Sequence, residues 1–229
     1  MRQKTRTQLS KGDASPALPP RRRARSDEDK AAVKALLIAT GHRLFSTMNA
    51  ADVSLRKLAA EAGYSPAVVY RHFADRRELF AAVRGHDMAV AADTLEIAIR
   101  GIKDPARRVV ALFDASVDYW LAHLDHFDVL FQMSPLPDAS RKPFGRSEVV
   151  ERILSLYYGT VEDWLASLPS RPIAARLAAD TLLAAVYGSI AFPRMTRTMQ
   201  WSDMRQMTRG LVRTLVRQWA AQAAAKLSG

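Results

Sequence analysis

Apolar residues recur at intervals of three and four along most of this chain, which is the spacing of one face of an α-helix. Val33, Leu37 and Leu44 form the first such face, and a helix is expected to begin just after Ser26. No stretch shows the sustained apolar–polar alternation of a β-strand. Further helices are expected from Asp75 to about Ile99, from Pro105 onward, and over 146–168, 172–192 and 202–227, with a long loop over 134–145. The pattern therefore predicts an all-α protein.

The segment 54–73 predicts two short helices joined by a tight turn. Ser54 can cap the first helix, and Gly63 can adopt the left-handed conformation that a sharp helix exit requires. Ser65 followed by Pro66 is typical of an N-cap with proline at the first helical position. This arrangement predicts a helix-turn-helix, in which the second helix enters the major groove of DNA.

The second short helix has one side that can be buried in the protein core and another that can contact DNA bases. Val69 and Phe73 lie four residues apart and are expected to face the protein core. The remaining positions, expected to face DNA, are Ser65, Pro66, Ala67, Val68 and Arg71. Apolar side chains can contact thymine methyl groups but donate no hydrogen bonds. Direct base readout is therefore expected from Arg56, Ser65 or Arg71.

Charge is concentrated at one end of the chain. The 229 residues carry a formal net charge of +11, and eight basic residues with a single acidic one lie in 1–26, whereas 27–100 is balanced. We expect 1–26 to be a disordered basic arm. Two interpretations of the arm stay open: an inert solubilising tail, or a sequence-independent grip on DNA.

Composition excludes several other classes of protein. The chain has no cysteine, which excludes disulfide frameworks, thiolate zinc sites and cysteine catalysis. No signal peptide is recognisable, and the longest uncharged apolar run, 181–193, is too short to span a bilayer. We therefore expect a cytoplasmic protein without a membrane partner.

Residues 30–85 resemble the DNA-binding domain of the TetR (tetracycline-repressor-like) family of transcriptional regulators. The run 55–65 (LRKLAAEAGYS) resembles the supporting helix and turn of that family. Residues 69–73 (VYRHF) resemble the end of its recognition helix, and 75–79 (DRREL) the start of its long linking helix. The resemblance implies a helix-turn-helix DNA-binding domain over 27–74 and a helical ligand-binding and dimerisation domain over 75–229.

The resemblance also implies roles for single residues. Tyr70 matches a tyrosine that usually touches phosphate, and His72 matches a position that often does likewise. Arg76 stands where the family usually has a phosphate-binding lysine. Ser65, Ala67 and Val68 fall at base-reading positions, but the family commonly has a lysine or polar residue, a glycine and a threonine at 66–68, where this chain has Pro, Ala and Val.

The last predicted helix carries an apolar stripe that needs a partner. The family builds a four-helix dimer interface from its last two long helices, and the alternative is an intramolecular core. The predicted interface residues are Leu182, Val186, Ile190, Leu211, Leu215 and Trp219. On the opposite face, arginines recur every four residues at Arg205, Arg209, Arg213 and Arg217. We expect them to form a solvated face, paired with acidic residues elsewhere, rather than a second nucleic-acid surface.

Aromatic and apolar residues between the linking helix and the dimer helices could line a ligand pocket of the kind the family uses for inducers. The candidates are Met88, Phe113, Trp120, His123, Phe127, Phe131, Tyr157 and Trp164, each of which can equally be ordinary core. His123 and His126 with Asp125 have metal-like spacing but lack a convincing third ligand, so neither a metal nor a cofactor is expected. No motif for catalysis is found.

The sequence thus predicts a homodimeric regulator that binds a palindromic operator in double-stranded DNA and is not an enzyme. A repressor released from the operator by a small, largely apolar inducer is the expected form. Two alternatives stay open: an all-helical enzyme or binding bundle with an incidental helix-turn-helix, and a constitutive DNA-binding protein without an inducer.

Overall fold

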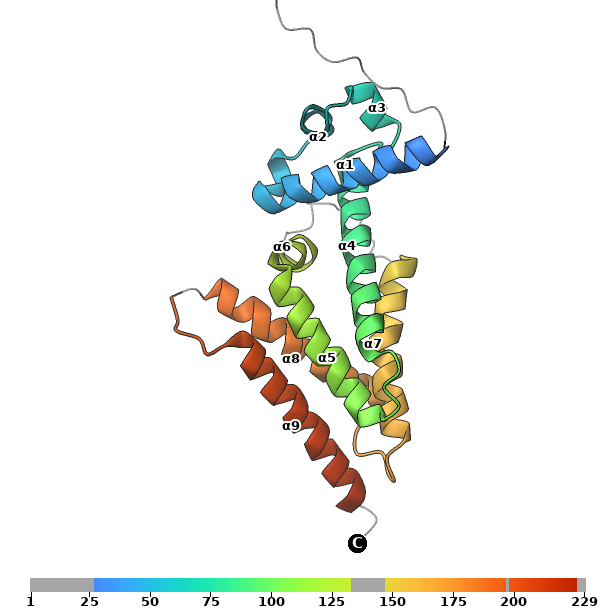
Figure 1. Ribbon diagram of the computed structural model, residues 1–229. Helices are drawn as coiled ribbons and strands as arrows, with labels where there is room; N and C mark the ends of the chain where they lie inside the picture. The colour runs from blue at the N-terminus through green and yellow to red at the C-terminus, as the bar shows by residue number, and fades with distance from the viewer. Residues whose placement is uncertain (1–26, 133–146, 197, 226–229) are drawn as a thin grey trace, which may run out of the picture.

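A computed structural model describes residues 27–132, 147–196 and 198–225, and this part of the chain contains helices and no strand. The all-α prediction is confirmed for these residues. The proposed basic arm and the loop predicted over 134–145 lie outside the described residues. Figure 1 shows a small N-terminal group of helices at one end of the molecule and a larger group below it, with one long helix running through both.

The N-terminal group consists of α1 (Asp27–Thr47), the short 3-10 helix η1 (Ala50–Asp52), α2 (Leu55–Ala62) and α3 (Pro66–Tyr70). They pack with the first half of α4 (Arg76–Ile99) around one hydrophobic cluster. Its buried members include Leu37, Phe45, Leu58, Val69, Phe73 and Leu79. The faces predicted from the apolar spacing of α1 and α3 are the ones that are buried.

The larger group consists of α5 (Pro105–Ala122), α6 (Leu124–Phe127), the π-helical turn η2 (Asp128–Gln132), α7 (Glu148–Ala166), α8 (Ala175–Met195) and α9 (Met204–Ala225). A second hydrophobic cluster joins them to the second half of α4. Its largest fully buried side chains are Trp120, Trp164, Tyr157, Phe113 and Phe127.

Helix α4 is shared between the two clusters. Leu79 and Val83 of its first half belong to the N-terminal cluster, and Ala91 and Leu95 of its second half belong to the C-terminal one. Val129 of η2 is also buried in the N-terminal cluster, although it follows α6 in the chain. The boundary expected at residue 75 therefore falls at the start of an element that serves both cores.

The predicted helix ends follow from local capping. The hydroxyl of Ser54 accepts from the backbone N–H of Lys57 at 3.2 Å, and the carboxylate of Asp75 accepts from the N–H of Glu78 at 2.8 Å. In return the Glu78 carboxylate accepts from the N–H of Ala74 at 2.6 Å, which completes a reciprocal box one residue before the cap. Both helices begin where the sequence predicts.

Helix α8 is the one helix in the described part of the chain that is long and apolar enough to cross a membrane by length and composition. Leu182, Val186 and Ile190 of this helix are buried in the C-terminal cluster, where α8 packs against α7 and α9. These contacts account for the inward face of α8, whereas Leu177, Phe192 and Met195 are more than half exposed.

Candidate nucleic-acid interface and the polar cluster behind it

The turn between α2 and α3 is closed by backbone hydrogen bonds around Gly63. Gly63 has φ 71° and ψ 23°, the left-handed conformation expected from the sequence. Its N–H donates to the carbonyl of Ala60 at 3.3 Å, and the N–H of Tyr64 donates to the carbonyl of Ala59 at 2.9 Å. This pair of bonds satisfies carbonyls that the end of α2 leaves open and directs the chain into α3.

Helix α3 turns one side inward and presents the other to solvent. Val69 and Phe73 are buried as expected, whereas 52% of Tyr70 is exposed. Pro66, Ala67 and Arg71 are exposed, and Ser65, Val68 and His72 are half-buried. Ser65 precedes the first helical residue as predicted, but its hydroxyl makes no capping hydrogen bond. The helix therefore presents its expected reading side outward, and contact of these residues with DNA stays a prediction.

Three of the predicted DNA-contacting residues meet in one depression. Arg56, Tyr70 and Arg76 line a groove of about 400 Å³ between the N-terminus of α2, the end of α3 and the N-terminus of α4. One guanidinium nitrogen of Arg76 donates to the carbonyl of Ala51 at 2.6 Å, which fixes the side chain across the groove. The Asp75 carboxylate already caps α4 there. A phosphate in this groove would therefore rely on Arg56, Tyr70 and Arg76, and not on the start of α4.

The histidine at the end of α3 is held neutral by its surroundings. Burial, and secondarily the positive charge of Arg71, lowers the pKa of His72 below its ordinary value. A neutral imidazole can donate one hydrogen bond and adds no charge to the surface.

The predicted pocket residues lie in or beside the C-terminal core, and whether they line a ligand pocket stays a prediction. Trp120, Phe127 and Phe131 lie in mutual ring contact, with centroids 4.9 to 6.0 Å apart, and Tyr187 joins them. Trp164 packs instead against Trp219, 6.3 Å away. Met88, Phe113 and Tyr157 are buried in the same C-terminal core, and His123 lies half-buried between α5 and α6.

The structure also contains a cleft of about 1140 Å³ that the sequence did not indicate. It lies between the α4–α5 connection, α5 and α9, and none of the eight predicted pocket residues lines it. Its lining includes Ile102, Val110 and Val216 together with Arg107 and Arg217.

Four of the six predicted dimer-interface residues face the chain's own core, which corrects the prediction for them. Leu182, Val186 and Ile190 have no exposed surface, and Trp219 keeps only 7%. Side chains buried this far in one chain have almost no surface to offer a second copy. Leu215 is half-buried, and Leu211 is 44% exposed. The apolar stripe of α9 is thus divided between an inward and an outward face.

Three of the four arginines on this face of α9 are paired with α5, as the sequence suggested, whereas Arg217 donates to the carbonyl of Arg213. Asp118 accepts from Arg205 at 2.7 Å and from Arg209 at 2.6 Å, and Asp114 accepts from Arg213 at 2.6 Å. These pairs occupy the charges that a second nucleic-acid surface would need, and they align α9 along α5.

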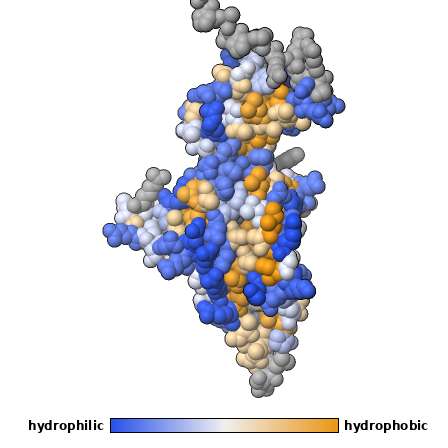
Figure 2. Space-filling view, viewed as in Figure 1, coloured by the Kyte–Doolittle hydropathy of each residue, from blue (hydrophilic) through white to orange (hydrophobic). Residues whose placement is uncertain are grey.

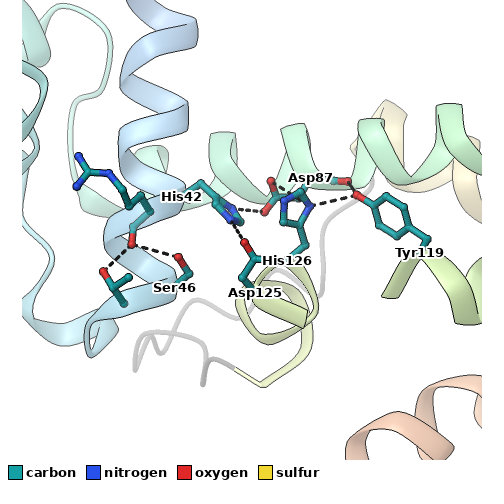
Figure 3. Close-up of polar contacts among 8 residues, drawn as sticks. His42, Ser46, Asp87, Tyr119, Asp125 and His126 are labelled. Atoms are coloured by element: carbon teal, nitrogen blue, oxygen red, sulfur yellow. Dashed lines mark hydrogen bonds and ion pairs between the residues drawn. The ribbon is translucent and has the colours of Figure 1, made fainter. Parts of the chain in front are cut away.

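Behind the helix-turn-helix, a polar cluster joins α1 to the C-terminal helices (Figure 3). His42 of α1 lies between two carboxylates: its Nδ1 is 3.0 Å from Asp87 of α4, and its Nε2 is 3.0 Å from Asp125 of α6. The ring of His126 lies 4.4 Å from that of His42, and its Nδ1 is 3.1 Å from the hydroxyl of Tyr119. Figure 2 shows hydrophilic surface where the N-terminal and C-terminal groups of helices meet, a region called the waist from here on.

The cluster sets the protonation of its members. The hydrogen bond with the buried Asp87 carboxylate, reinforced by Asp125, raises the pKa of His42 to about 9. Burial lowers the pKa of His126, so two neighbouring imidazoles are shifted in opposite directions. Burial by itself would raise the pKa of Asp125. The hydrogen bonds from His42 and from the backbone N–H of His126 outweigh burial, so the pKa of this carboxyl is lowered.

Sequence reasoning identified half of this cluster. The sequence grouped His123 and His126 with Asp125, without a convincing third ligand. In the structure His42, 83 positions before Asp125, takes a place in the group, and His123 does not. Ligand atoms of His42, Asp125 and His126 all lie within 4.8 Å of one another. No local signal in α1 could have linked His42 to α6, because the contact depends on how α1 packs across the waist.

Comparisons with known proteins agree on the fold. Residues 37–83 match the family described as bacterial regulatory proteins, tetR family. A solved structure of a protein with unknown function from Rhodococcus sp. RHA1 is 24% identical, covers 82% of this chain and 95% of its own, and has a TM-score of 0.67. A tetR-family transcriptional regulator from Streptomyces coelicolor is 19% identical, with 85% and 83% covered and a TM-score of 0.61.

A third solved structure is the fatty acid degradation regulator FadR from Bacillus halodurans. It is 12% identical, with 80% of this chain and 94% of that chain covered and a TM-score of 0.60. At these identities the likeness shows a shared fold. None of the curated proteins compared with this chain matches it.

Proposed function

We propose, from the premise that this chain belongs to the tetR family of bacterial regulatory proteins and is a DNA-binding regulator, that it is a homodimeric, cytoplasmic repressor. In this proposal it binds a palindromic operator and is released by a small, largely apolar ligand. The observation that carries DNA binding is the outward side of α3 beside the groove lined by Arg56, Tyr70 and Arg76.

The groove has the features that a DNA backbone needs. Two guanidinium groups and a 52% exposed tyrosine ring lie beside the start of α2, where helix N–H groups favour negative charge. Phosphate contacts of this kind position a recognition helix without carrying sequence information. Base discrimination would then come from α3 itself, through Ser65 and Arg71 and through apolar contacts of Ala67 and Val68.

The dimer part of the proposal rests on the outward faces of α8 and α9. Leu177, Phe192 and Met195 of α8 are each more than half exposed, and their spacing places them on one side of the helix. The exposed Leu211 extends this apolar surface to α9. Exposed apolar surface shared by two neighbouring helices is typical of a contact with another protein, and a two-fold copy would match a palindromic operator.

The ligand part rests on the aromatic group around Trp120. Trp120 and Phe127 are fully buried, and Phe131, in ring contact with both, is 41% exposed and brings the group to the surface. A largely apolar molecule would bind there by separating these rings, which supply the apolar walls that such a ligand needs. Two structural neighbours are named as regulators of fatty acid degradation and fatty acid metabolism, so a panel of fatty acids is the first set of probes.

DNA binding is tested with fragments that flank the gene of this protein, by fluorescence anisotropy at several salt concentrations. Arg56→Ala is expected to weaken binding to all fragments and to reduce the slope of log K against log salt by about 0.9, the share of one phosphate contact. Tyr70→Phe is expected to weaken binding by about 3- to 10-fold, as for loss of one hydrogen bond. Arg107→Ala removes the same charge from exposed surface on α5 and serves as the matched control.

Two outcomes distinguish the alternatives. If no fragment binds more tightly than random DNA at any salt concentration, the operator proposal fails and a helical binding bundle is favoured. If an operator binds but no fatty acid or other apolar probe changes the affinity, a constitutive DNA-binding protein is favoured.

A further inference from the structure

The polar cluster at the waist contains more coordinating groups than an interhelical ion pair needs. Two imidazoles and two carboxylates converge from three helices: His42 from α1, Asp87 from α4, and Asp125 with His126 from α6. Ligand atoms of three of them, His42, Asp125 and His126, lie within 4.8 Å of one another. Figure 3 shows His42 between Asp87 and Asp125, with the ring of His126 beside it and directed toward Asp87 and Tyr119.

The spacing is close to that of a coordination shell. In a tetrahedral zinc site with bonds of about 2.0–2.1 Å, neighbouring ligand atoms lie about 3.3 Å apart. The His42 Nε2 and Asp125 Oδ2 atoms are already 3.0 Å apart. The ligand atom of His126 lies within 4.8 Å of the other two, so binding would draw the three side chains closer together.

The surrounding groups are those that orient metal ligands in proteins. A ligating histidine usually donates its second ring N–H to a carboxylate, which fixes the tautomer and points the other nitrogen at the metal. Asp87, only 1% exposed, takes this place behind His42, at 3.0 Å from Nδ1. Tyr119 stands at 3.1 Å from Nδ1 of His126 and can hold that ring in the same way.

Charge and access also favour a cation. Asp87 and Asp125 hold His42 in its protonated form near neutral pH, so a divalent ion would displace that proton on binding. The two carboxylates would then compensate the charge of the ion. The Asp125 side chain is 51% exposed, whereas Asp87 is enclosed. An ion could therefore enter from solvent on the α6 side and keep a water molecule as a fourth ligand.

We propose that His42, Asp125 and His126 form a binding site for a divalent transition-metal ion, with Asp87 as the buried support of His42. Two imidazoles and one carboxylate favour ions such as Zn²⁺, Co²⁺ or Ni²⁺ over Mg²⁺ or Ca²⁺, which prefer oxygen ligands. The site ties α1, which packs against the first helix of the helix-turn-helix, to α6, which belongs to the C-terminal helices.

The position of the site gives it a consequence for DNA binding. A bound ion would fix the angle between α1 and α6, and any state in which these helices separate would lose the ion. By linkage, the ion and the operator then change each other's affinity by the same factor. This coupling rests on the proposed function, whereas metal binding by itself does not.

Metal binding is measured first without DNA, on the full chain after treatment with a chelator. Co²⁺ is added and followed by its visible absorption, and Zn²⁺ is used to compete it off, with calorimetry for stoichiometry. One ion per chain is expected. His126→Gln and Asp125→Asn are each expected to weaken binding by at least about 10- to 100-fold, because each removes a ligand and the loss of an outer-shell partner alone costs that much. Circular dichroism checks that both variants are folded, and Asp125→Asn changes a side chain that is half exposed.

The control is His86→Asn, which removes an exposed histidine of α4 one position before Asp87. Its Co²⁺ spectrum and affinity are expected to equal those of the wild type. If no ion binds, or if His126→Gln and Asp125→Asn bind as the wild type does, the metal proposal is wrong and the cluster is only an ion-paired clasp.

Operator affinity with Zn²⁺ and with chelator is measured second. A change of about fivefold or more that disappears in Asp125→Asn supports the coupling. Tight metal binding without any change in operator affinity overturns the coupling and leaves the site itself in place. A protein that binds metal but no operator refutes the proposed function instead.

Discussion

The left-handed residue between α2 and α3 gives the sharpest test of how the helix-turn-helix is held. Gly63 has φ 71°, and a Cβ built on it would meet nothing within 4 Å. Replacement by alanine therefore introduces no clash with a neighbour, and its cost comes from the backbone alone. Gly159 of α7 also has open space around it, but its backbone is helical. The pair separates conformational strain from packing.

Gly63→Ala and Gly159→Ala are expected to change the free energy of unfolding in opposite directions. An L-residue in the left-handed region costs about 1–2 kcal/mol, and the lower entropy of the unfolded alanine chain offsets about 0.4–1 kcal/mol of this. Gly63→Ala is expected to lower the free energy of unfolding by about 1 kcal/mol, and Gly63→Asn by less, because asparagine tolerates this conformation. Gly159→Ala is expected to raise it by about 0.5–1 kcal/mol.

Urea denaturation followed by two signals locates the change. All four tryptophans lie at or beyond Trp120, so tryptophan fluorescence follows the C-terminal core, whereas circular dichroism follows all helices. Gly63→Ala is expected to shift the circular dichroism transition at least as much as the fluorescence transition. Equal stabilisation by Gly63→Ala and Gly159→Ala would refute the reasoning, since only strain at residue 63 distinguishes them.

Three other changes test the C-terminal core, the α8–α9 surface and the polar cluster. Trp219→Ala is expected to lower the free energy of unfolding by about 3–5 kcal/mol, measured by urea titration, because the side chain is buried. Leu211→Asp is expected to give a monomer by analytical ultracentrifugation without loss of helix, and a persistent dimer would argue against the α8–α9 surface. The raised pKa of His42 stabilises the metal-free protein fully below about pH 6.5, and this contribution is lost as the pH rises through about 9. The stability difference between wild type and His42→Asn should shrink over that window, and a constant difference would contradict the assignment.

Local capping and turn residues made the helix-turn-helix predictable from the sequence. Ser54, Gly63 and Asp75 each dictate the conformation of their own few residues, and the structure places each one as predicted. The burial of Val69 and Phe73 follows from helical spacing in the same way. Ser65 shows the limit of such reasoning, because its position before Pro66 was right but its hydroxyl does not cap the helix.

Features that depend on packing between distant helices could not be predicted from the sequence. The stripe of α9 is apolar on more than one side, and only the packing of α8 decides that Trp219 faces inward while Leu211 faces solvent. The break between α5 and α6 after His123 also lacks a glycine or proline signal. The same break positions Asp125 and His126 opposite α1, so an unpredicted kink is what completes the polar cluster.

The shared helix α4 makes the molecule a lever. Its 24 residues span about 36 Å at 1.5 Å per residue. A tilt of about 5° at the C-terminal end would move the helix-turn-helix end by about 3 Å, which is close to the 3.4 Å between successive bases along a DNA strand. In a pair of chains that tilt in opposite directions, the change in the distance between the two recognition helices is twice this displacement. A ligand or ion that reorients this helix by a few degrees therefore has enough leverage to shift two recognition helices out of register with one operator.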